Sequence, residues 1–293
     1  MSTKLDYRMI DTGETNIWTA VTGAGPPLLL LHGHPQTHMM WLKVAELLAP
    51  HFTLVMPDLR GYGRSGKPPS RADHIPYSKR VMAQDMVAVM DALGFDRFHI
   101  AGHDRGGRVT HRLCLDHPQR VTRAAVLDIA PTLHMYSTTN RDFATGYWHW
   151  FFLIQPHPLP EKIIGADPLQ FWRLKCGSGA AGLAPFAEAA LADYLECYAN
   201  ADTIHAICED YRASATIDLQ HDQADVDSGR KLDCPLLVLW GRMGKIGEWY
   251  DPVGVWRQYA TQVHGAAVAA GHYLAEESPA ETGQLLLDHF ITG

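Results

Sequence analysis

One short segment restricts the fold of this chain more than any other. The apolar run at residues 98–101 leads directly into Gly102-His103-Asp104-Arg105-Gly106-Gly107, and a stretch with helical spacing follows at 107–116. Glycines on both sides of one side chain let a strand turn sharply into a helix. The turn holds the central side chain, here that of Asp104, above the end of the sheet. The segment therefore predicts a strand, a tight turn and a helix that together present one carboxylate.

The same alternation of apolar runs and turns recurs along the chain. Further runs lie at residues 28–31, 53–56, 124–127, 235–240 and 266–269. Continuous apolar runs are typical of buried parallel strands, and helical spacing appears between them, for example at 81–93. This order of strands and helices predicts an α/β fold with a mostly parallel, doubly wound sheet.

The pattern changes between residues 132 and 222. This region is rich in aromatic residues and helical spacing, and a block of aromatic residues at 147–152 lies near its start. The strand pattern returns only after it. We therefore expect a core made of residues 1–131 and 223–293, interrupted by a helical cap at 132–222.

Composition narrows the possible partners. The 293 residues carry 25 Lys and Arg against 32 Asp and Glu, a formal net charge of −7. A general nucleic-acid or anionic-membrane binder needs the opposite balance, so we expect neither as a partner. An anionic substrate would need a local cluster of Arg or Lys.

Cysteine usage and the N-terminus indicate where the protein works. The five cysteines are scattered without CxxC spacing, so neither disulfides nor a zinc site are indicated. The polar first residues lack the apolar stretch of a secretion signal. We expect a cytoplasmic protein with no cofactor and no metal.

The identity of the side chain in the turn determines the chemistry it can perform. A carboxylate is already anionic, which suits displacement at a saturated carbon, and the ester so formed must then be hydrolysed by an activated water. The simpler interpretation is that Asp104 only caps the following helix, a common role for Asp.

A histidine near the C-terminus is the candidate general base. His272 follows the last predicted strand, and a neutral imidazole can accept a proton from water near pH 7. The order nucleophile, acid, histidine is that of α/β-hydrolases. Because residues 242–245 contain no carboxylate, Asp128 at the end of the preceding core strand is the preferred acid, with Glu248 and Asp251 as alternatives.

An early turn offers backbone donors. His32-Gly33-His34-Pro35 follows a predicted strand, where α/β-hydrolases place one oxyanion-hole N–H. The other comes from the residue after the nucleophile, so we expect the backbone N–H groups of His34 and Arg105 to form the oxyanion hole. The alternative is a turn that merely ends the strand. A metal site at these histidines is not favoured, since no carboxylate lies at ligand spacing.

Several motifs in combination resemble one family. The chain closely resembles the haloacetate (fluoroacetate) dehalogenases from about residue 32 to residue 272, in the segments 103–108, 127–131, 147–151, 164–168 and 210–213. The resemblance implies the α/β-hydrolase fold with an inserted helical cap. It also implies Asp104 as nucleophile, His272 as base, Asp128 as its partner and a homodimer.

The resemblance further assigns substrate contacts. Arg105 and Arg108 correspond to the clamp for the substrate carboxylate, and two guanidiniums suit a planar anion. His149, Trp150 and Tyr211 correspond to the halide pocket, where their N–H and O–H donors would stabilise a leaving halide.

The chain departs from the family at the cavity. His34 stands where Phe is expected, and residues 175–182 lack the tryptophan found there in relatives. Tyr273 and Leu274 replace two phenylalanines. These changes concern substrate size and halide preference more than the triad.

We expect a hydrolytic dehalogenase that converts a small haloacid, fluoroacetate or chloroacetate, to glycolate and halide through an aspartyl ester. One alternative is an epoxide hydrolase, which needs a pair of cap tyrosines from the candidates Tyr147, Tyr194, Tyr198 and Tyr211. The arginine pair argues against it, since a neutral epoxide needs no carboxylate clamp. The other alternative is a ligand-binding protein on a hydrolase scaffold. Such proteins often lose a catalytic residue, whereas all three candidate triad residues are present here.

Overall fold

A single eight-stranded sheet runs through the molecule in the computed structural model, which describes residues 4–179 and 181–291. The strands are β1 (Asp6–Asp11), β2 (Asn16–Gly23), β3 (Pro27–Leu31), β4 (Thr53–Pro57), β5 (Phe98–His103), β6 (Val121–Leu127), β7 (Leu236–Gly241) and β8 (Val263–Val268). Their order across the sheet is β1-β2-β4-β3-β5-β6-β7-β8. The six strands β3 to β8 run parallel to one another, while β1 and β2 form an antiparallel edge. The predicted mostly parallel sheet is confirmed.

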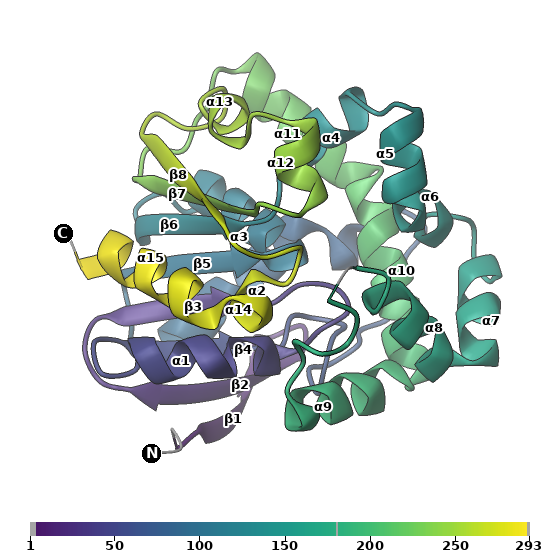
Figure 1. Ribbon diagram of the computed structural model, residues 1–293, viewed down its shortest axis with the longest axis horizontal. Coiled ribbons are helices and arrows are strands. Elements are labelled where there is room, and N and C mark those ends of the chain that lie inside the picture. The colour runs from purple at the N-terminus through teal and green to yellow at the C-terminus, as the bar shows by residue number, and fades with distance from the viewer. Residues whose placement is uncertain (1–3, 180, 292–293) are drawn as a thin grey trace.

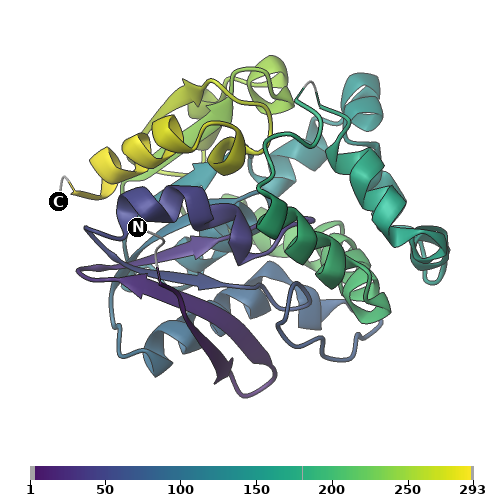
Figure 2. The ribbon, with the colours of Figure 1, turned by 60° about the horizontal axis from the view of Figure 1, so that its bottom comes forward.

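Helices cover both faces of the sheet. The core helices are α1 (Leu42–Leu48), α2 (Lys79–Ala92), α3 (Arg105–Asp116), α12 (Lys245–Trp249), α13 (Pro252–Trp256), α14 (Leu274–Glu277) and α15 (Pro279–Ile291), with short 3-10 turns η1 (His38–Trp41) and η2 (Ile75–Tyr77). The pair α1 and α15 packs on one face, and the pair α2 and α3 on the other (Figures 1 and 2). Because both faces are covered, strand residues such as Leu28 to Leu31 are fully buried, which explains the continuous apolar runs.

Between β6 and β7 the described residues form helices and no strand. These are α4 (Thr132–Ser137), α5 (Arg141–Gly146), α6 (Trp148–Leu153), α7 (Leu159–Ala166), α8 (Pro168–Cys176), α9 (Glu188–Tyr198), α10 (Ala201–Ser214) and α11 (Ile217–Asp227). In Figure 1, α5 to α10 lie to the right of the strands, and α11 lies above them near α12. The predicted boundary at residue 222 falls inside α11, and the division into core and cap stays a prediction.

The parallel order of the strands brings distant parts of the sequence together. The turns after β3, β5, β6 and β8 all lie at the same edge of the sheet, where the carboxyl ends of parallel strands meet. In the part of the chain that the structure describes, none of the helices has the length and apolar character required to cross a membrane.

Candidate active site

Asp104 occupies the tight turn between β5 and α3. Its φ is 47°, an uncommon conformation for a residue other than glycine. A Cβ at Gly102 would lie 2.3 Å from the carbonyl oxygen of Gly106, and a Cβ at Gly106 would lie 2.4 Å from that of His32, so both positions require glycine. The Asp104 side chain makes no capping hydrogen bond to α3, which contradicts the simpler interpretation of this residue as a helix cap.

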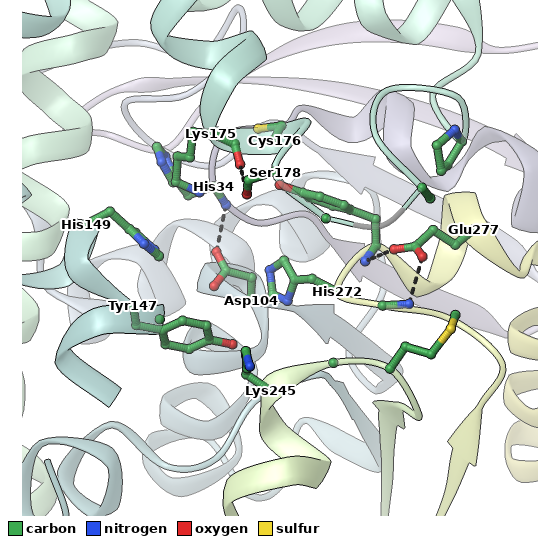
Figure 3. A pocket seen from close by; sticks show the side chains of 18 of the residues that line it. His34, Asp104, Tyr147, His149, Lys175, Cys176, Ser178, Lys245, His272 and Glu277 are labelled. Atoms are coloured by element: carbon green, nitrogen blue, oxygen red, sulfur yellow. Dashed lines mark hydrogen bonds between the residues drawn. The ribbon is translucent and has the colours of Figure 1, made fainter. Parts of the chain in front are cut away.

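The Asp104 carboxylate is held by one backbone donor. The His34 N–H donates to Oδ1 at 2.8 Å (Figure 3). Among the described residues, Oδ2 accepts no hydrogen bond, and the Arg105 N–H, the second expected donor, makes no hydrogen bond to the carboxylate. Burial alone would raise the pKa of Asp104, but the positive charges of His272 and Arg105 hold that pKa well below its usual range. The group is therefore an ionised carboxylate with one oxygen free to react.

His272 and Asp128 form a hydrogen-bonded pair. The His272 Nδ1 lies 2.7 Å from the Asp128 Oδ2, and the other oxygen of Asp128 accepts the Gly241 N–H at 2.9 Å. Burial lowers the pKa of His272, but the hydrogen bond and charge of Asp128 outweigh burial, and the net shift is upward. This contact orients the ring so that Nε2 is the nitrogen that can accept a proton.

The two alternative acids lie elsewhere. The Glu248 carboxylate pairs with Lys245 at 2.8 Å, and Asp251 caps α13 by accepting the Gly254 N–H at 3.1 Å. Since Asp128 contacts His272 directly, the geometry favours Asp128.

His103 is a positioning residue that the sequence reasoning missed. Its Nε2 lies 2.8 Å from the backbone oxygen of His272 and therefore donates to it. Burial lowers the pKa of His103 to about 3, so the ring stays neutral and keeps this donor role. The signal was its place inside the turn motif, directly before Asp104.

Part of the Arg105 guanidinium is paired with the carboxylate of Asp210. Its Nε and Nη2 donate to the two carboxylate oxygens of Asp210, at 2.9 and 2.8 Å. Its guanidinium carbon lies 4.1 Å from the centre of the Tyr211 ring. Only Nη1 is buried without a partner, so one donor of this arginine remains for a ligand.

The Arg108 guanidinium also lies over an aromatic ring, but among the described residues it has no carboxylate partner. Its Nη1 donates to the Ala130 carbonyl at 3.1 Å and to the Thr132 hydroxyl at 3.0 Å, and its guanidinium lies 4.6 Å from the Trp150 ring centre. Its Nε is buried and unpaired. The arginines lie against rings that line the cavity, but neither is itself a cavity-lining residue.

A cavity of about 300 Å³ lies between the ends of the strands and the helices that follow β6 (Figure 3). Asp104 and His272 line it together with His149, Trp150 and Tyr211. The Tyr211 ring centre lies 5.9 Å from that of His149 and 6.4 Å from that of Trp150. The Tyr211 hydroxyl is buried without a partner, which leaves a donor available to an anion.

Comparison with known proteins is consistent with this geometry. Residues 26–279 match the family model of the alpha/beta hydrolase fold. A fluoroacetate dehalogenase from Burkholderia sp. is 45% identical over 96% of this chain and 92% of its own length. A soluble epoxide hydrolase from Corynebacterium sp. (strain C12) is 30% identical over 95% of each chain. The crystal structure of an α/β-hydrolase from Nostoc sp. PCC 7120 is 52% identical over the full length of both chains, with a TM-score of 0.96.

The fold, the turn and the His–Asp pair define an α/β-hydrolase, and the chain belongs to that family. Within it, the chain is an enzyme of the haloacetate dehalogenase group, the hydrolases that act on carbon–halide bonds.

Proposed function

We propose that the enzyme hydrolyses a 2-haloacetate to glycolate and halide through an ester on Asp104. The observation that carries the proposal is an ionised carboxylate with one oxygen held by a backbone N–H, in the same cavity as a His–Asp pair. In the first step Oδ2 of Asp104 attacks C2 and the halide leaves with the bonding electrons. The unpaired donors of Arg105 and Arg108 would hold the substrate carboxylate.

The departing halide needs donors where its charge develops. The Tyr211 hydroxyl, the Trp150 indole N–H and the His149 imidazole supply them from the cavity wall. Burial lowers the pKa of His149 well below its ordinary value, and the charge of Lys175 adds to this effect. His149 is therefore neutral and offers one N–H.

The second step hydrolyses the ester. His272 takes a proton from water, and the resulting hydroxide attacks the carboxyl carbon of Asp104. Negative charge then develops on Oδ1, the oxygen to which the His34 N–H donates. Asp128 stabilises the imidazolium, and collapse of the intermediate releases glycolate and restores the Asp104 carboxylate.

The test is halide release from fluoroacetate and from chloroacetate by the wild-type enzyme and by Asp104→Asn. We expect release by the wild type and none by the variant, since an amide oxygen is a poor nucleophile. Chloride release without fluoride would keep the nucleophile and contradict a halide pocket adequate for fluoride. Equal release by Asp104→Asn would contradict the proposal.

An epoxide hydrolase is the second candidate because two of the four candidate tyrosines, Tyr147 and Tyr211, line the cavity, as does Tyr273. The other two candidate tyrosines do not line it, and the Tyr194 hydroxyl donates to Glu276 at 3.0 Å. The similarity to an epoxide hydrolase supports this candidate as well. Diol formation from an epoxide without halide release would favour it over the dehalogenase.

A further inference from the structure

The cavity contains a cation that the proposed mechanism does not use. Lys175 lies in the last turn of α8, is half-buried and lines the cavity beside His34 (Figure 3). Among the described residues, no carboxylate pairs with its ammonium and no group accepts a hydrogen bond from it. A second lining lysine, Lys245, differs because its ammonium pairs with Glu248 at 2.8 Å. Lys175 is therefore the lining cation whose charge is free to meet a ligand.

Neither of the two carboxylates in the cavity wall, Asp104 and Glu277, forms an ion pair with Lys175. Asp104 is held by the His34 N–H, and Glu277 accepts the backbone N–H groups of Gly271 and Tyr273 at 2.7 and 2.9 Å. Glu277 therefore serves the loop that carries the base. An anionic ligand would supply the missing counter-charge.

The His34 side chain is a second unpaired group at the same place. The residue is only 1% exposed, and neither ring nitrogen has a hydrogen-bond partner. Burial, followed by the nearby charge of Lys175, lowers the pKa of His34 well below its ordinary value, so the ring is neutral and carries one N–H donor. Buried polar groups without partners are uncommon in proteins, and this one faces a cavity.

There is space next to these two groups. Directly after Lys175, the described residues that line the cavity up to residue 182 have small side chains or none: Cys176, Ser178, Gly179, Ala181 and Gly182. A cavity of about 300 Å³ falls in the range that holds drug-sized ligands, whereas a haloacetate has a two-carbon skeleton. The cavity can therefore hold a longer acid than haloacetate.

We propose that Lys175 and the His34 imidazole form a second anion subsite, and that the enzyme accepts haloacids with a second carboxylate, such as 2-halosuccinates. The inference rests on the proposed function, because the reacting atoms are the same. Oδ2 of Asp104 forms the bond to C2 while the halide leaves with its electron pair, and hydrolysis of the ester yields 2-hydroxysuccinate. The second carboxylate would bind the Lys175 ammonium and the His34 N–H.

The experiment compares kcat/KM for 2-chlorosuccinate with that for 2-chlorobutanoate, which has a methyl group in place of the second carboxylate. Chloroacetate is the reference substrate. We expect the wild type to prefer 2-chlorosuccinate, and Lys175→Met to reduce that preference about tenfold or more, as for loss of a hydrogen bond to a charged group. Lys175→Arg should retain the preference, and Lys245→Met, the matched control, should leave it unchanged.

Different failures have different meanings. A wild type that releases chloride from chloroacetate but shows no preference for 2-chlorosuccinate would overturn the subsite. An unchanged preference in Lys175→Met would also overturn it. If the wild type released no chloride from any of the three acids, the proposed function would fail instead.

Discussion

Asp104 and Asp128 share an unusual backbone conformation. Of the described residues other than glycine, only His74, Asp104 and Asp128 have positive φ, with values of 47° and 50° for the two aspartates. Each such residue costs about 1–3 kcal/mol, which the surrounding structure must offset. Both aspartates directly follow parallel strands, β5 and β6, and the strained turns aim their carboxylates at the site. The sequence indicated Asp104 through its flanking glycines, whereas Asp128 was favoured by its place at a strand end, by the lack of a carboxylate at 242–245 and by the family resemblance.

Substitution of Asp128 tests the coupling to His272. Asp128 raises the pKa of His272, so the wild-type rate should fall with decreasing pH as His272 protonates, with a midpoint above the ordinary value of about 6.5. Asp128→Asn removes the charge that stabilises imidazolium, so this midpoint should move to lower pH, and kcat should drop about a hundredfold or more. The pH profile of kcat for chloroacetate measures both effects. An unchanged midpoint would contradict the role of Asp128.

Helix α10 is tied to the core helices by one buried carboxylate. Asp210 accepts two hydrogen bonds from Arg105 at the start of α3, one from Lys79 at the start of α2, and one from the Tyr62 hydroxyl at 2.6 Å. Burial alone would raise the pKa of Asp210, but the two cations hold it well below its usual range. The segment 210–213 contributed to the family resemblance, yet this role could not be predicted. It depends on elements more than 100 residues apart approaching each other.

Loss of the Asp210 charge should destabilise the protein. Asp210→Asn leaves Arg105 buried without its counter-charge and leaves Lys79 with the more distant Asp218, at 3.6 Å. Breaking a buried ion pair in this way costs about 3–5 kcal/mol. Urea unfolding of the variant against the wild type measures this cost. Tyr62→Phe, which removes one neutral donor to the same carboxylate, is the control and should cost about 1 kcal/mol. Equal stability of Asp210→Asn and the wild type would show that the pair does not anchor α10.

Over the whole molecule, the sequence predicted the parallel strands well because these strands are buried on both faces. The antiparallel edge was not assigned, since β1 is exposed at every position except Ile10 and has no apolar run. The strand β8 begins at Val263, earlier than the predicted residue 266. Its early residues His264 and Gly265 are exposed, so no apolar run marked them as part of a strand. Side-chain pairing was the least predictable feature, since the sequence could not show that the Arg105 guanidinium forms an ion pair with Asp210.

A buried acid links three distant parts of the chain and should make stability depend on pH. Glu276 on α14 accepts hydrogen bonds from Gln36 and from Tyr194 of α9. Burial raises its pKa from 4.5 to about 8. Between these values the folded chain holds a proton that the unfolded chain releases, so the contribution of Glu276 to the free energy of unfolding falls as pH rises.

Glu276→Gln should remove this dependence, because an amide does not titrate. We expect the variant to lose less stability than the wild type between about pH 5 and pH 8. Thermal or urea unfolding at several pH values measures the difference. Parallel curves for the two proteins would contradict the raised pKa.

The central claim is that Asp104 forms a covalent ester that His272 then hydrolyses. The most direct measurement is the mass of the peptide containing Asp104, from His272→Asn protein denatured after exposure to chloroacetate. This variant keeps the nucleophile but lacks the base, so we predict that the peptide gains the mass of one carboxymethyl group, while His272→Asn/Asp104→Asn gains none. An unmodified peptide from His272→Asn, under conditions where the wild type releases chloride, would contradict the account.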